Sequence, residues 1–556
     1  MNASSKLLSQ TVVQLCLKKG IRHIVLSPGS RNAPLTIGFT DHPDFENFSI
    51  VDERCAAFFA LGMAQQLKAP VAVVCTSGSA LLNYFPAVAE AFYSDIPLVV
   101  LSADRPAHLV EIGDGQTIQQ EQVYGNHVLY AANCKEGEAH QVFNETEINV
   151  ALNTAIELQG PVHINLPFSE PLYQVVPNFQ LEPQNVPVRP FTAESLEESR
   201  FKDFMQTWNR ATKKMILVGV LPPNSIEQQY VDFLAEDPSV LVLTETTSNL
   251  HHENFIPAID QLITALDAEA LEVLQPEVLV TFGGMVVSKR IKAFLRKFQP
   301  NTHWHIDPKK AYDTFFALDF HYKNTPNGFL EIVQKNAAIV TSSYQDGWLK
   351  VRENRLIRHK LYLAKATFSD FTVFAEIFEN LPGGVQLQLA NSATIRYAQL
   401  FDIDPTLEVF CNRGTSGIDG STSTAIGAAW AVKKQTVFVT GDLSFFYDSN
   451  ALWNNYIPPN FRIIIVNNSG GGIFRILPGA KESTHFSNYF ETTHHLKAKQ
   501  LSEMFGFEYT SANSQNELKA ALTNFFSISE KPKILEIVTP SEVNDRILLD
   551  YFDFIA

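Results

Sequence analysis

Two polar turns in the C-terminal part of the chain carry residues that could hold a metal ion and a diphosphate. The apolar run Thr436–Thr440 ends in Gly441-Asp442-Leu443-Ser444. A second apolar run, Phe461–Val466, ends in two asparagines, Ser469 and then three glycines. Each run is typical of a buried parallel strand with polar residues at its carboxyl end.

The two turns are expected to meet at one edge of a parallel sheet. We predict a helix over residues 447–453 in the crossover, which places Asp442 and Asn468 at neighbouring strand ends, where open α/β sheets bind ligands. A carboxylate, an amide oxygen and the Gly470 carbonyl suit Mg²⁺ that also holds a diphosphate, and glycines 470–472 let backbone approach the phosphates. The alternative is two ordinary turns rich in Gly and Asn.

Similar turns follow the predicted strands of the N-terminal part. Ser27-Pro28-Gly29-Ser30-Arg31 follows His23–Leu26 and offers backbone N–H groups, a hydroxyl and a guanidinium to an anion. Thr76-Ser77-Gly78 and Asp104-Arg105-Pro106 follow two further strands, and the loop over residues 113–120 carries amide side chains. Polar strand ends on one edge are how an active face is built.

Glu53 lies where a strand passes into a long apolar helix, residues 55–66. Burial beside that helix can raise the pKa of its carboxyl group, so that it exchanges protons near neutrality. The alternative is that Asp52 and Glu53 merely cap the helix, favoured by its dipole.

The composition bounds the class of protein. The 556 residues are 45% hydrophobic and 18% charged, as in a water-soluble globular protein of three to four domains. A net charge of −16 argues against nucleic-acid binding. We find neither a signal peptide nor a membrane span, since the longest apolar stretch is only residues 55–64. Five cysteines without a CxxC pattern indicate reduced, buried thiols in the cytoplasm.

Short apolar runs alternate with helical patterns along the chain, which indicates α/β domains with doubly wound parallel sheets. A Pro-rich linker between domains is expected over residues 175–200, and a second, less distinct domain boundary is expected between residues 324 and 370. We therefore predict three domains, over residues 1–180, 190–345 and 355–556.

Taken together, the motifs resemble one family of thiamine diphosphate enzymes, the 2-succinyl-5-enolpyruvyl-6-hydroxy-3-cyclohexene-1-carboxylate synthases (MenD family) of menaquinone biosynthesis. The resemblance covers essentially the whole chain. Its matching segments are residues 27–31, 52–54, 76–78, 103–106, 115–117, 288–290, 391–392 with Arg396, 412–420, 441–444 and 467–474. Asn32, Ser79 and Ser469 depart mildly from the family pattern.

The resemblance implies a pyrimidine-binding, a central Rossmann-like and a diphosphate-binding domain, with thiamine diphosphate and Mg²⁺ or Mn²⁺ as cofactors. The implied metal ligands are Asp442, Asn468 and Gly470. Glu53 would be catalytic, through a hydrogen bond to the cofactor's aminopyrimidine ring. The implied cofactor-binding residues are Glu53, Thr76, Ser77, Gly78, Ser416, Gly417, Ile418, Gly441, Asp442, Leu443, Ser444, Asn468, Gly470, Gly471, Ile473 and Phe474. Ile418 would bend the cofactor; plain core packing is an equal alternative.

The implied substrates are 2-oxoglutarate and isochorismate, joined with loss of CO₂ by a 1,4-addition. Both are dicarboxylates, and guanidinium groups pair with carboxylates in a bidentate way. The implied substrate-binding residues are Ser30, Arg31, Arg105, Gln116, Lys289, Arg290, Asn391, Ser392, Arg396, Arg413 and Phe474. For any one arginine, the alternative is a solvated surface charge.

In the resembling enzymes Glu53 and the diphosphate turns come from different chains, which implies a homodimer, or a dimer of such dimers, with interfacial active sites. The alternative functions are those of an acetolactate synthase-like enzyme, a 2-oxo acid decarboxylase, or a non-catalytic protein of this fold. We expect no flavin, because no GxGxxG follows the central strands. The histidines, among them His251, His252 and His494, show no metal-ligand spacing and are read as surface or packing residues.

Overall fold

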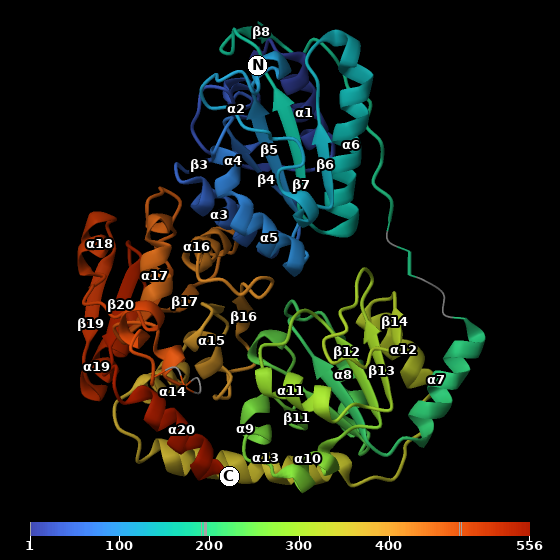
Figure 1. Ribbon diagram of the computed structural model, residues 1–556, viewed down its shortest axis with the longest axis vertical. Coiled ribbons are helices and arrows are strands. Elements are labelled where there is room, and N and C mark those ends of the chain that lie inside the picture. The colour runs from blue at the N-terminus through green and yellow to red at the C-terminus, as the bar shows by residue number, and fades with distance from the viewer. Residues whose placement is uncertain (1, 191, 194–196, 477–478, 480) are drawn as a thin grey trace.

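Three six-stranded parallel sheets organise the chain, one in each third of the sequence (Figure 1). The computed structural model describes residues 2–190, 192–193, 197–476, 479 and 481–556. Helices cover both faces of each sheet, so the predicted α/β class with three doubly wound sheets is confirmed.

The N-terminal sheet has the strand order β3-β2-β4-β5-β7-β6. Its strands are β2 (His23–Leu26), β3 (Glu46–Ser49), β4 (Val71–Cys75), β5 (Leu98–Asp104), β6 (Tyr130–Asn133) and β7 (Val162–Pro167). The helices around it are α1 (Leu7–Lys18), α2 (Ala33–Thr40), α3 (Glu53–Leu67), α4 (Ala80–Asn83), α5 (Phe85–Ser94) and α6 (Gln141–Leu158).

The expected linker begins later than predicted. Val175–Pro177 forms strand β8, which pairs antiparallel with β1 (Asn2–Ser4) and so belongs to the N-terminal domain. Residues 191 and 194–196 of the expected linker lie outside the described residues.

The central sheet has the order β11-β10-β9-β12-β13-β14. Successive strands are added first on one side of β9 and then, from β12 onward, on its other side. Its strands are β9 (Lys214–Val218), β10 (Val240–Leu243), β11 (Phe255–Ile256), β12 (Val278–Phe282), β13 (Thr302–Ile306) and β14 (Phe320–Tyr322). Its helices are α7 (Glu198–Arg210), α8 (Gln228–Glu236), α9 (Ile259–Ile263), α10 (Ala268–Leu274), α11 (Lys289–Lys297) and α12 (Pro326–Asn336).

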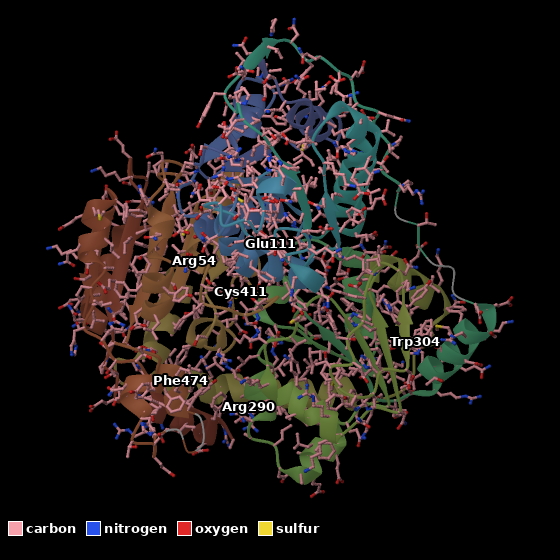
Figure 2. The ribbon with its side chains drawn as sticks, turned by 45° about the horizontal axis from the view of Figure 1, so that its top comes forward. Arg54, Glu111, Arg290, Trp304, Cys411 and Phe474 are labelled. Atoms are coloured by element: carbon pink, nitrogen blue, oxygen red, sulfur yellow. The ribbon has the colours of Figure 1, made fainter. Side chains whose placement is uncertain are left out.

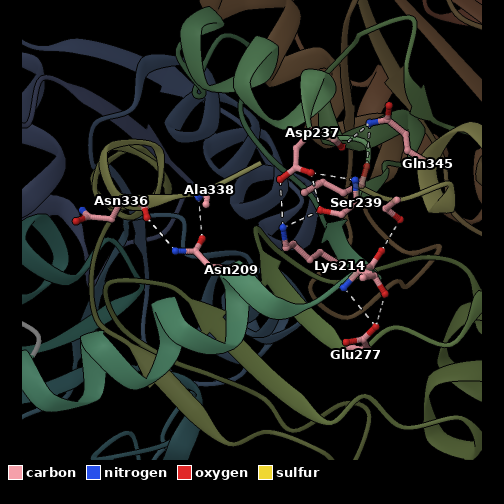
Figure 3. Close-up of polar contacts among 11 residues, drawn as sticks. Asn209, Lys214, Asp237, Ser239, Glu277, Asn336, Ala338 and Gln345 are labelled. Atoms are coloured by element: carbon pink, nitrogen blue, oxygen red, sulfur yellow. Dashed lines mark hydrogen bonds and ion pairs between the residues drawn. The ribbon is translucent and has the colours of Figure 1, made fainter. Parts of the chain in front are cut away.

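A buried ion pair closes the amino end of the central sheet (Figure 3). The Lys214 ammonium lies 3.2 Å from the Asp237 carboxylate and donates to the Ser239 hydroxyl at 2.7 Å. Asp237 also accepts from the Ser239 backbone N–H at 2.9 Å. All three residues are buried, so each charge has its partners inside the protein.

The C-terminal sheet has the order β16-β15-β17-β18-β20-β19. Its strands are β15 (Gln386–Leu389), β16 (Glu408–Cys411), β17 (Thr436–Gly441), β18 (Phe461–Asn467), β19 (Glu508–Ala512) and β20 (Lys533–Val538). Its helices are α14 (Asp370–Asn380), α15 (Ala393–Ala398), α16 (Ser421–Ala431), α17 (Asp442–Tyr447), α18 (Lys499–Met504), α19 (Gln515–Phe525) and α20 (Asn544–Ile555).

The crossover is helical, as predicted, but its α-helix lies earlier than residues 447–453. Helix α17 begins at Asp442 itself, and Ser449–Leu452 forms only a 3₁₀ turn. The Asp442 side chain accepts from the next backbone N–H, that of Leu443, at 2.7 Å, which suits the first turn of a helix. The crossover itself exists, because β17 and β18 pair in parallel.

Helices α3 and α16 join the N-terminal and C-terminal domains (Figure 1). A Cβ on Gly62 would lie 2.0 Å from the Thr424 carbonyl oxygen, and one on Gly427 would lie 2.0 Å from that of Phe59. The two helices therefore approach backbone to backbone, which only glycine permits. Helix α13 (Tyr344–Leu363) packs against both the central and C-terminal domains along the lower edge of Figure 1.

Candidate active site

The carboxyl ends of β17 and β18 bring Asp442 and Asn468 to one edge of the C-terminal sheet. The strands pair with Gly441 opposite Val466, so the residues that follow lie at adjacent strand ends. Asp442 is 2% exposed, and its Oδ2 accepts the Gly470 backbone N–H at 3.0 Å. The turn after β18 therefore folds over the Asp442 carboxylate.

Asn468 offers an oxygen that the protein leaves free. Its Nδ2 donates to Asp370 at 2.8 Å, which fixes the amide orientation, while its buried Oδ1 has no hydrogen-bond partner among the described residues. A buried acceptor without a partner is unfavourable unless a ligand satisfies it. Gly470 has a φ of 152°, and a Cβ there would lie 2.7 Å from the Glu491 carbonyl oxygen. The oxygen set of these turns fits Mg²⁺ bound together with a diphosphate.

His494 packs against the Phe446 ring, at 5.6 Å between ring centres, as its interpretation as a packing residue expects, but it also contacts Asp442. Its Nε2 lies 3.2 Å from Asp442 Oδ2, and the side chain is 12% exposed. Residue spacing could not find this contact, because His494 lies in a loop beyond a 3₁₀ segment and a π-helical turn.

Asp370, the partner of Asn468, is a buried carboxyl group. Burial raises its pKa to about 6, although its hydrogen bonds with Thr539 and Asn468 act to lower it.

The loop after β16 carries Arg413, Ser416, Gly417 and Ile418. Asn391, at the end of β15, holds this loop by donating to the Gly417 carbonyl at 2.7 Å and accepting from Arg413 Nη1 at 2.7 Å. The Ser444 hydroxyl donates to the Ile418 carbonyl at 3.1 Å, which links the loop to helix α17. The expected residues of β15, β16 and β17 therefore form one connected edge.

Glu90 holds the same loop from the N-terminal domain, a contact that no sequence motif predicts. This residue of α5 is 1% exposed and accepts from the Gly414 and Thr415 backbone N–H groups at 2.7 and 2.6 Å, and from the Thr415 hydroxyl at 2.8 Å. The two segments lie more than 300 residues apart in the sequence, so no local pattern could connect them.

Ile473 and Phe474 lie in the short 3₁₀ segment Gly472–Ile476, directly after the glycines of the β18 turn. Both are half-buried, and the Phe474 ring lies 6.2 Å from that of Phe490. A Cβ on Gly471 would contact the Phe474 ring at 3.1 Å, so the glycine turn and this aromatic side chain pack together.

Four of the expected cationic residues lie on elements where the central domain meets the C-terminal domain. Lys289 and Arg290 begin helix α11, and Arg290 lies 5.0 Å from the ring centre of Phe552 in α20. Arg396, in α15, donates to the Ser392 carbonyl at 2.8 Å. Burial and the charge of Arg413 lower the pKa of Arg396, while Asp260 raises it, and Asp260 in turn interacts with Arg290. Figure 2 labels Arg290 and Phe474.

The N-terminal sheet edge collects the other expected residues. Arg31 is 6% exposed, donates to the Phe168 carbonyl at 2.8 Å and lies 3.2 Å from Glu170. Arg105 donates to the Gly115 carbonyl at 3.2 Å. Burial and the charge of Arg105 both lower the pKa of Arg31, which places the two guanidinium groups near each other. Ser30 is exposed beside them.

The turn Thr76–Gly78, whose residues are expected to bind the cofactor, lies on the same edge of the sheet. Gly78 has a φ of 89° and donates its N–H to Gln120 Oε1 at 2.9 Å. A Cβ there would lie 3.2 Å from the main chain of Gln116, so the two loops are in contact. The buried Ser77 hydroxyl has no partner among the described residues and can bind a ligand.

Glu53 is the first residue of α3, and both sequence interpretations of this junction hold in part. Asp52 is the helix cap, since it accepts from the Cys55 N–H at 3.2 Å. The Glu53 carboxyl is half-buried, and burial raises its pKa, as predicted, with Asp52 adding to the rise. The helix therefore has a cap and, beside it, a carboxyl group whose pKa lies above its ordinary value.

Within one chain the expected residues form two groups. One contains Ser30, Arg31, Glu53, Thr76–Gly78, Arg105 and Gln116, and the other contains Lys289, Arg290 and the residues of the C-terminal sheet edge. Across the described part of the chain, no hydrogen bond or ion pair joins a member of one group to a member of the other. Glu53 and Asp442 are therefore not brought into direct contact.

Two further expectations have structural outcomes. All five cysteines are buried and free, which confirms the prediction of buried thiols without disulfides. In the segments that the structure describes, no helix is both long and apolar enough to pass through a membrane.

The three domains match known domain families. Residues 7–127 match the thiamine pyrophosphate enzyme N-terminal TPP binding domain, residues 186–377 the middle domain of thiamine pyrophosphate enzymes, and residues 391–537 the thiamine pyrophosphate enzyme C-terminal TPP binding domain. The protein is thus a thiamine diphosphate enzyme by its domains. The fold agrees: benzoylformate decarboxylase from Polynucleobacter necessarius superposes with a TM-score of 0.71 at 15% identity, covering 96% of this chain and 99% of that one.

Curated relatives are much closer in sequence. The 2-succinyl-5-enolpyruvyl-6-hydroxy-3-cyclohexene-1-carboxylate synthase of Flavobacterium johnsoniae is 55% identical, and that of Christiangramia forsetii is 53% identical, each over 98% of both chains. The synthase of Porphyromonas gingivalis is 37% identical over 97% of this chain and 95% of its own. With such identity over nearly the full length, the chain belongs to the family of thiamine diphosphate-dependent 2-succinyl-5-enolpyruvyl-6-hydroxy-3-cyclohexene-1-carboxylate synthases.

Proposed function

We propose that the protein removes CO₂ from 2-oxoglutarate and adds the remaining succinyl unit to isochorismate in a 1,4-addition. The product is 2-succinyl-5-enolpyruvyl-6-hydroxy-3-cyclohexene-1-carboxylate, an intermediate of menaquinone biosynthesis. The observation that carries this proposal is the 53–55% identity to synthases of that name over 98% of the chain.

Thiamine diphosphate would bind with Mg²⁺ or Mn²⁺ at the C-terminal sheet edge. Asp442, the free Oδ1 of Asn468 and the Gly470 carbonyl would hold the metal. When bound, thiamine diphosphate supplies a carbon nucleophile and stores the electron pair released as CO₂ leaves. The remaining cofactor contacts would come from Thr76, Ser77, Gly78, Ser416, Gly417, Ile418, Gly441, Leu443, Ser444, Gly471, Ile473 and Phe474.

Glu53 would act as the catalytic acid by holding a proton at its carboxyl group next to the aminopyrimidine ring. Its raised pKa supports this role, because a proton donor works best when its pKa lies near the operating pH. The half-exposed position at the start of α3 leaves the carboxyl group accessible to a ligand.

The dicarboxylate substrates would be held by the cationic residues of both groups. Arg31 and Arg105 form one pair, and Lys289, Arg290, Arg396 and Arg413 form a second cluster. Ser30, Gln116, Asn391 and Ser392 would add neutral hydrogen bonds, and Phe474 would wall the pocket. Clusters of cations in a protein of net charge −16 favour anionic substrates.

We further propose that residues 1–180, 190–345 and 355–556 are the pyrimidine-binding, central and diphosphate-binding domains. A homodimer, or a dimer of such dimers, would bring Glu53 of one chain to the diphosphate turns of its partner. The separation of the two residue groups within one chain supports this arrangement, as do the exposed apolar side chains Val51 and Leu82 near Glu53. The free cysteines fit a cytoplasmic protein.

The test measures CO₂ release from 2-oxoglutarate by the pure protein with thiamine diphosphate and Mg²⁺, with and without isochorismate. Rapid release that depends on isochorismate is the expected result. Turnover of pyruvate, with none of 2-oxoglutarate, would instead favour an acetolactate synthase-like enzyme or a 2-oxo acid decarboxylase.

A further inference from the structure

Helix α11 begins with two cations, contrary to the usual preference of a helix. Lys289 and Arg290 are its first two residues, where the helix dipole is positive and acidic side chains are favoured. Its last turn also carries cations, Arg296 and Lys297. The Lys289 and Arg290 side chains are exposed, and two carboxylates lie beside the amino end of the helix.

Glu245 supplies one negative charge at this place. The residue follows strand β10 and is 3% exposed. Its two carboxylate oxygens accept the backbone N–H groups of Val287 and Ser288, each at 2.7 Å. These are the residues that lead into α11, so Glu245 fixes the backbone from which Lys289 and Arg290 project.

Asp260 supplies the second negative charge. This residue of α9 accepts a short hydrogen bond from the Ser288 hydroxyl, which in turn accepts the Ile291 N–H at 3.1 Å as the helix cap. Burial raises the pKa of Asp260, whereas the Ser288 bond and the charges of Arg290 and Arg396 lower it. Asp260 therefore faces one cation of the central domain and one of the C-terminal domain.

Glu245 also interacts with a charged residue of the C-terminal domain, Arg413. Burial raises the pKa of Glu245 to about 7, while the two backbone N–H groups and Arg413 act in the opposite direction. Because both oxygens accept N–H groups, the geometry is that of the ionised carboxylate. Removing both carboxylates would leave Lys289, Arg290, Arg396 and Arg413 to repel one another across the domain boundary.

We propose that Glu245 and Asp260 are positioning residues, which hold these four cations of two domains as one preformed receptor for a dicarboxylate substrate. The proposal rests on the proposed function in taking a dicarboxylate as the ligand. Neither residue needs to touch that ligand, because Glu245 acts through the α11 backbone and Asp260 through Ser288 and the two arginines.

The experiment compares Glu245→Gln and Asp260→Asn with a matched control, Asp237→Asn. Asp237 is a buried carboxylate of the same domain, but it lies at the opposite end of β10, paired with Lys214. Its loss should lower thermal stability without altering the cationic cluster. Steady-state kinetics would give KM for each substrate and kcat, and calorimetry would give the affinity of the holoprotein for glutarate, an unreactive dicarboxylate.

We expect Glu245→Gln to raise KM for at least one substrate and weaken glutarate binding by about tenfold or more, since one backbone N–H loses its charged acceptor. Asp260→Asn should act in the same direction. Hydrogen–deuterium exchange at the cofactor thiazolium carbon should keep its wild-type rate in both variants, because the cluster does not serve cofactor activation. A general loss of structure would slow that exchange as well.

Wild-type KM and glutarate affinity in both variants would overturn the proposal, as would an equal change in Asp237→Asn. Glutarate binding separates this result from a failure of the proposed function. If the wild-type protein binds glutarate but does not turn over 2-oxoglutarate, and Glu245→Gln binds glutarate more weakly, the reaction assignment fails while the positioning role stands.

Discussion

Several buried polar atoms without partners in the described part of the chain belong to residues expected to bind cofactor or substrate. Among the described residues, the buried polar side-chain atoms that lack a hydrogen-bond partner include Asn468 Oδ1, Ser77 Oγ and the Nε atoms of Arg31, Arg105 and Arg413. Leaving such groups buried and unpaired costs about 1–3 kcal/mol each. Asn468 Oδ1 and Ser77 Oγ can therefore gain a hydrogen bond from a bound ligand, whereas other atoms without partners among the described residues, such as Trp208 Nε1, belong to the core.

Glu53→Gln is expected to reduce turnover by two or more orders of magnitude while the protein still folds and binds Mg²⁺. An amide cannot take up and release the proton that a carboxyl group exchanges. The rate of hydrogen–deuterium exchange at the thiazolium carbon of bound cofactor, followed by NMR, would report the loss directly. Glu46→Gln, on the edge strand β3, is the control. Exchange at the wild-type rate in Glu53→Gln would contradict the assigned role.

Among the elements, the junction of α3, α16 and α17 depends on one buried carboxylate. Asp448 is fully buried and accepts from the Ser423 N–H at 2.8 Å and its hydroxyl at 3.1 Å, while Arg54 lies 3.6 Å away. Burial raises its pKa to about 7, against the effect of Ser423 and Arg54. Arg54 is labelled in Figure 2. One acidic group therefore connects three helices of two domains.

This raised pKa predicts a pH-dependent stability. Between about pH 4 and pH 7 the folded protein keeps a proton on Asp448 that the unfolded chain has lost. The stabilising contribution is therefore complete at low pH and falls as the pH rises through that window. Asp448→Asn does not titrate, so its melting temperature relative to the wild type should rise from pH 5.5 to pH 8 in calorimetric scans. A difference that stays constant over this range would exclude the effect.

The buried pair at the amino end of the central sheet predicts a stability effect of another kind. Lys214→Met should lower the free energy of unfolding by about 3–5 kcal/mol, because Asp237 then remains buried without its counter-ion. Lys350→Met is the matched control: Lys350 pairs with Asp346 at 2.6 Å on α13, but both side chains are mostly exposed. Melting temperatures would compare the two. Equal shifts would mean that burial of the Lys214 pair contributes nothing.

The elements of the site differ in how well a sequence predicts them. The strands β17 and β18 and the turns after them follow from uninterrupted apolar runs that end in Gly, Asp and Asn. The sequence assigns Gly441 to Ser444 to a polar turn and predicts a helix only from residue 447, whereas helix α17 begins at Asp442, because an acidic residue suits both a turn and the first turn of a helix. Boundaries depend on such local competition, which a hydrophobic pattern does not resolve.

Contacts between remote segments escape sequence patterns altogether. Glu90 reaches Gly414 and Thr415 from another domain, and His494 reaches Asp442 from a distant loop. Each is a single polar residue whose partner is fixed by tertiary packing rather than by spacing. The same holds for Glu245, which lies 42 residues before the backbone that it holds.

For the whole molecule, the division of the site residues into two groups has a direct consequence. Helices α3 and α16 hold the N-terminal and C-terminal domains of one chain closely together, and no hydrogen bond joins Glu53 to Asp442 among the described residues. A second chain would supply the missing half of each site. In a symmetric dimer, each partner would give one half and receive the other.

Co-expression of two inactive variants tests this arrangement. Glu53→Gln and Asp442→Asn should each be inactive alone, because every site then contains one defect. In a mixed dimer, one site collects both defects and the other collects none. If half of the dimers are mixed, about one quarter of the wild-type activity should return. Differently tagged subunits would allow the mixed dimer to be purified, and it should have about half of the wild-type activity per dimer. No recovery in the purified mixed dimer would place Glu53 and Asp442 of each site on the same chain.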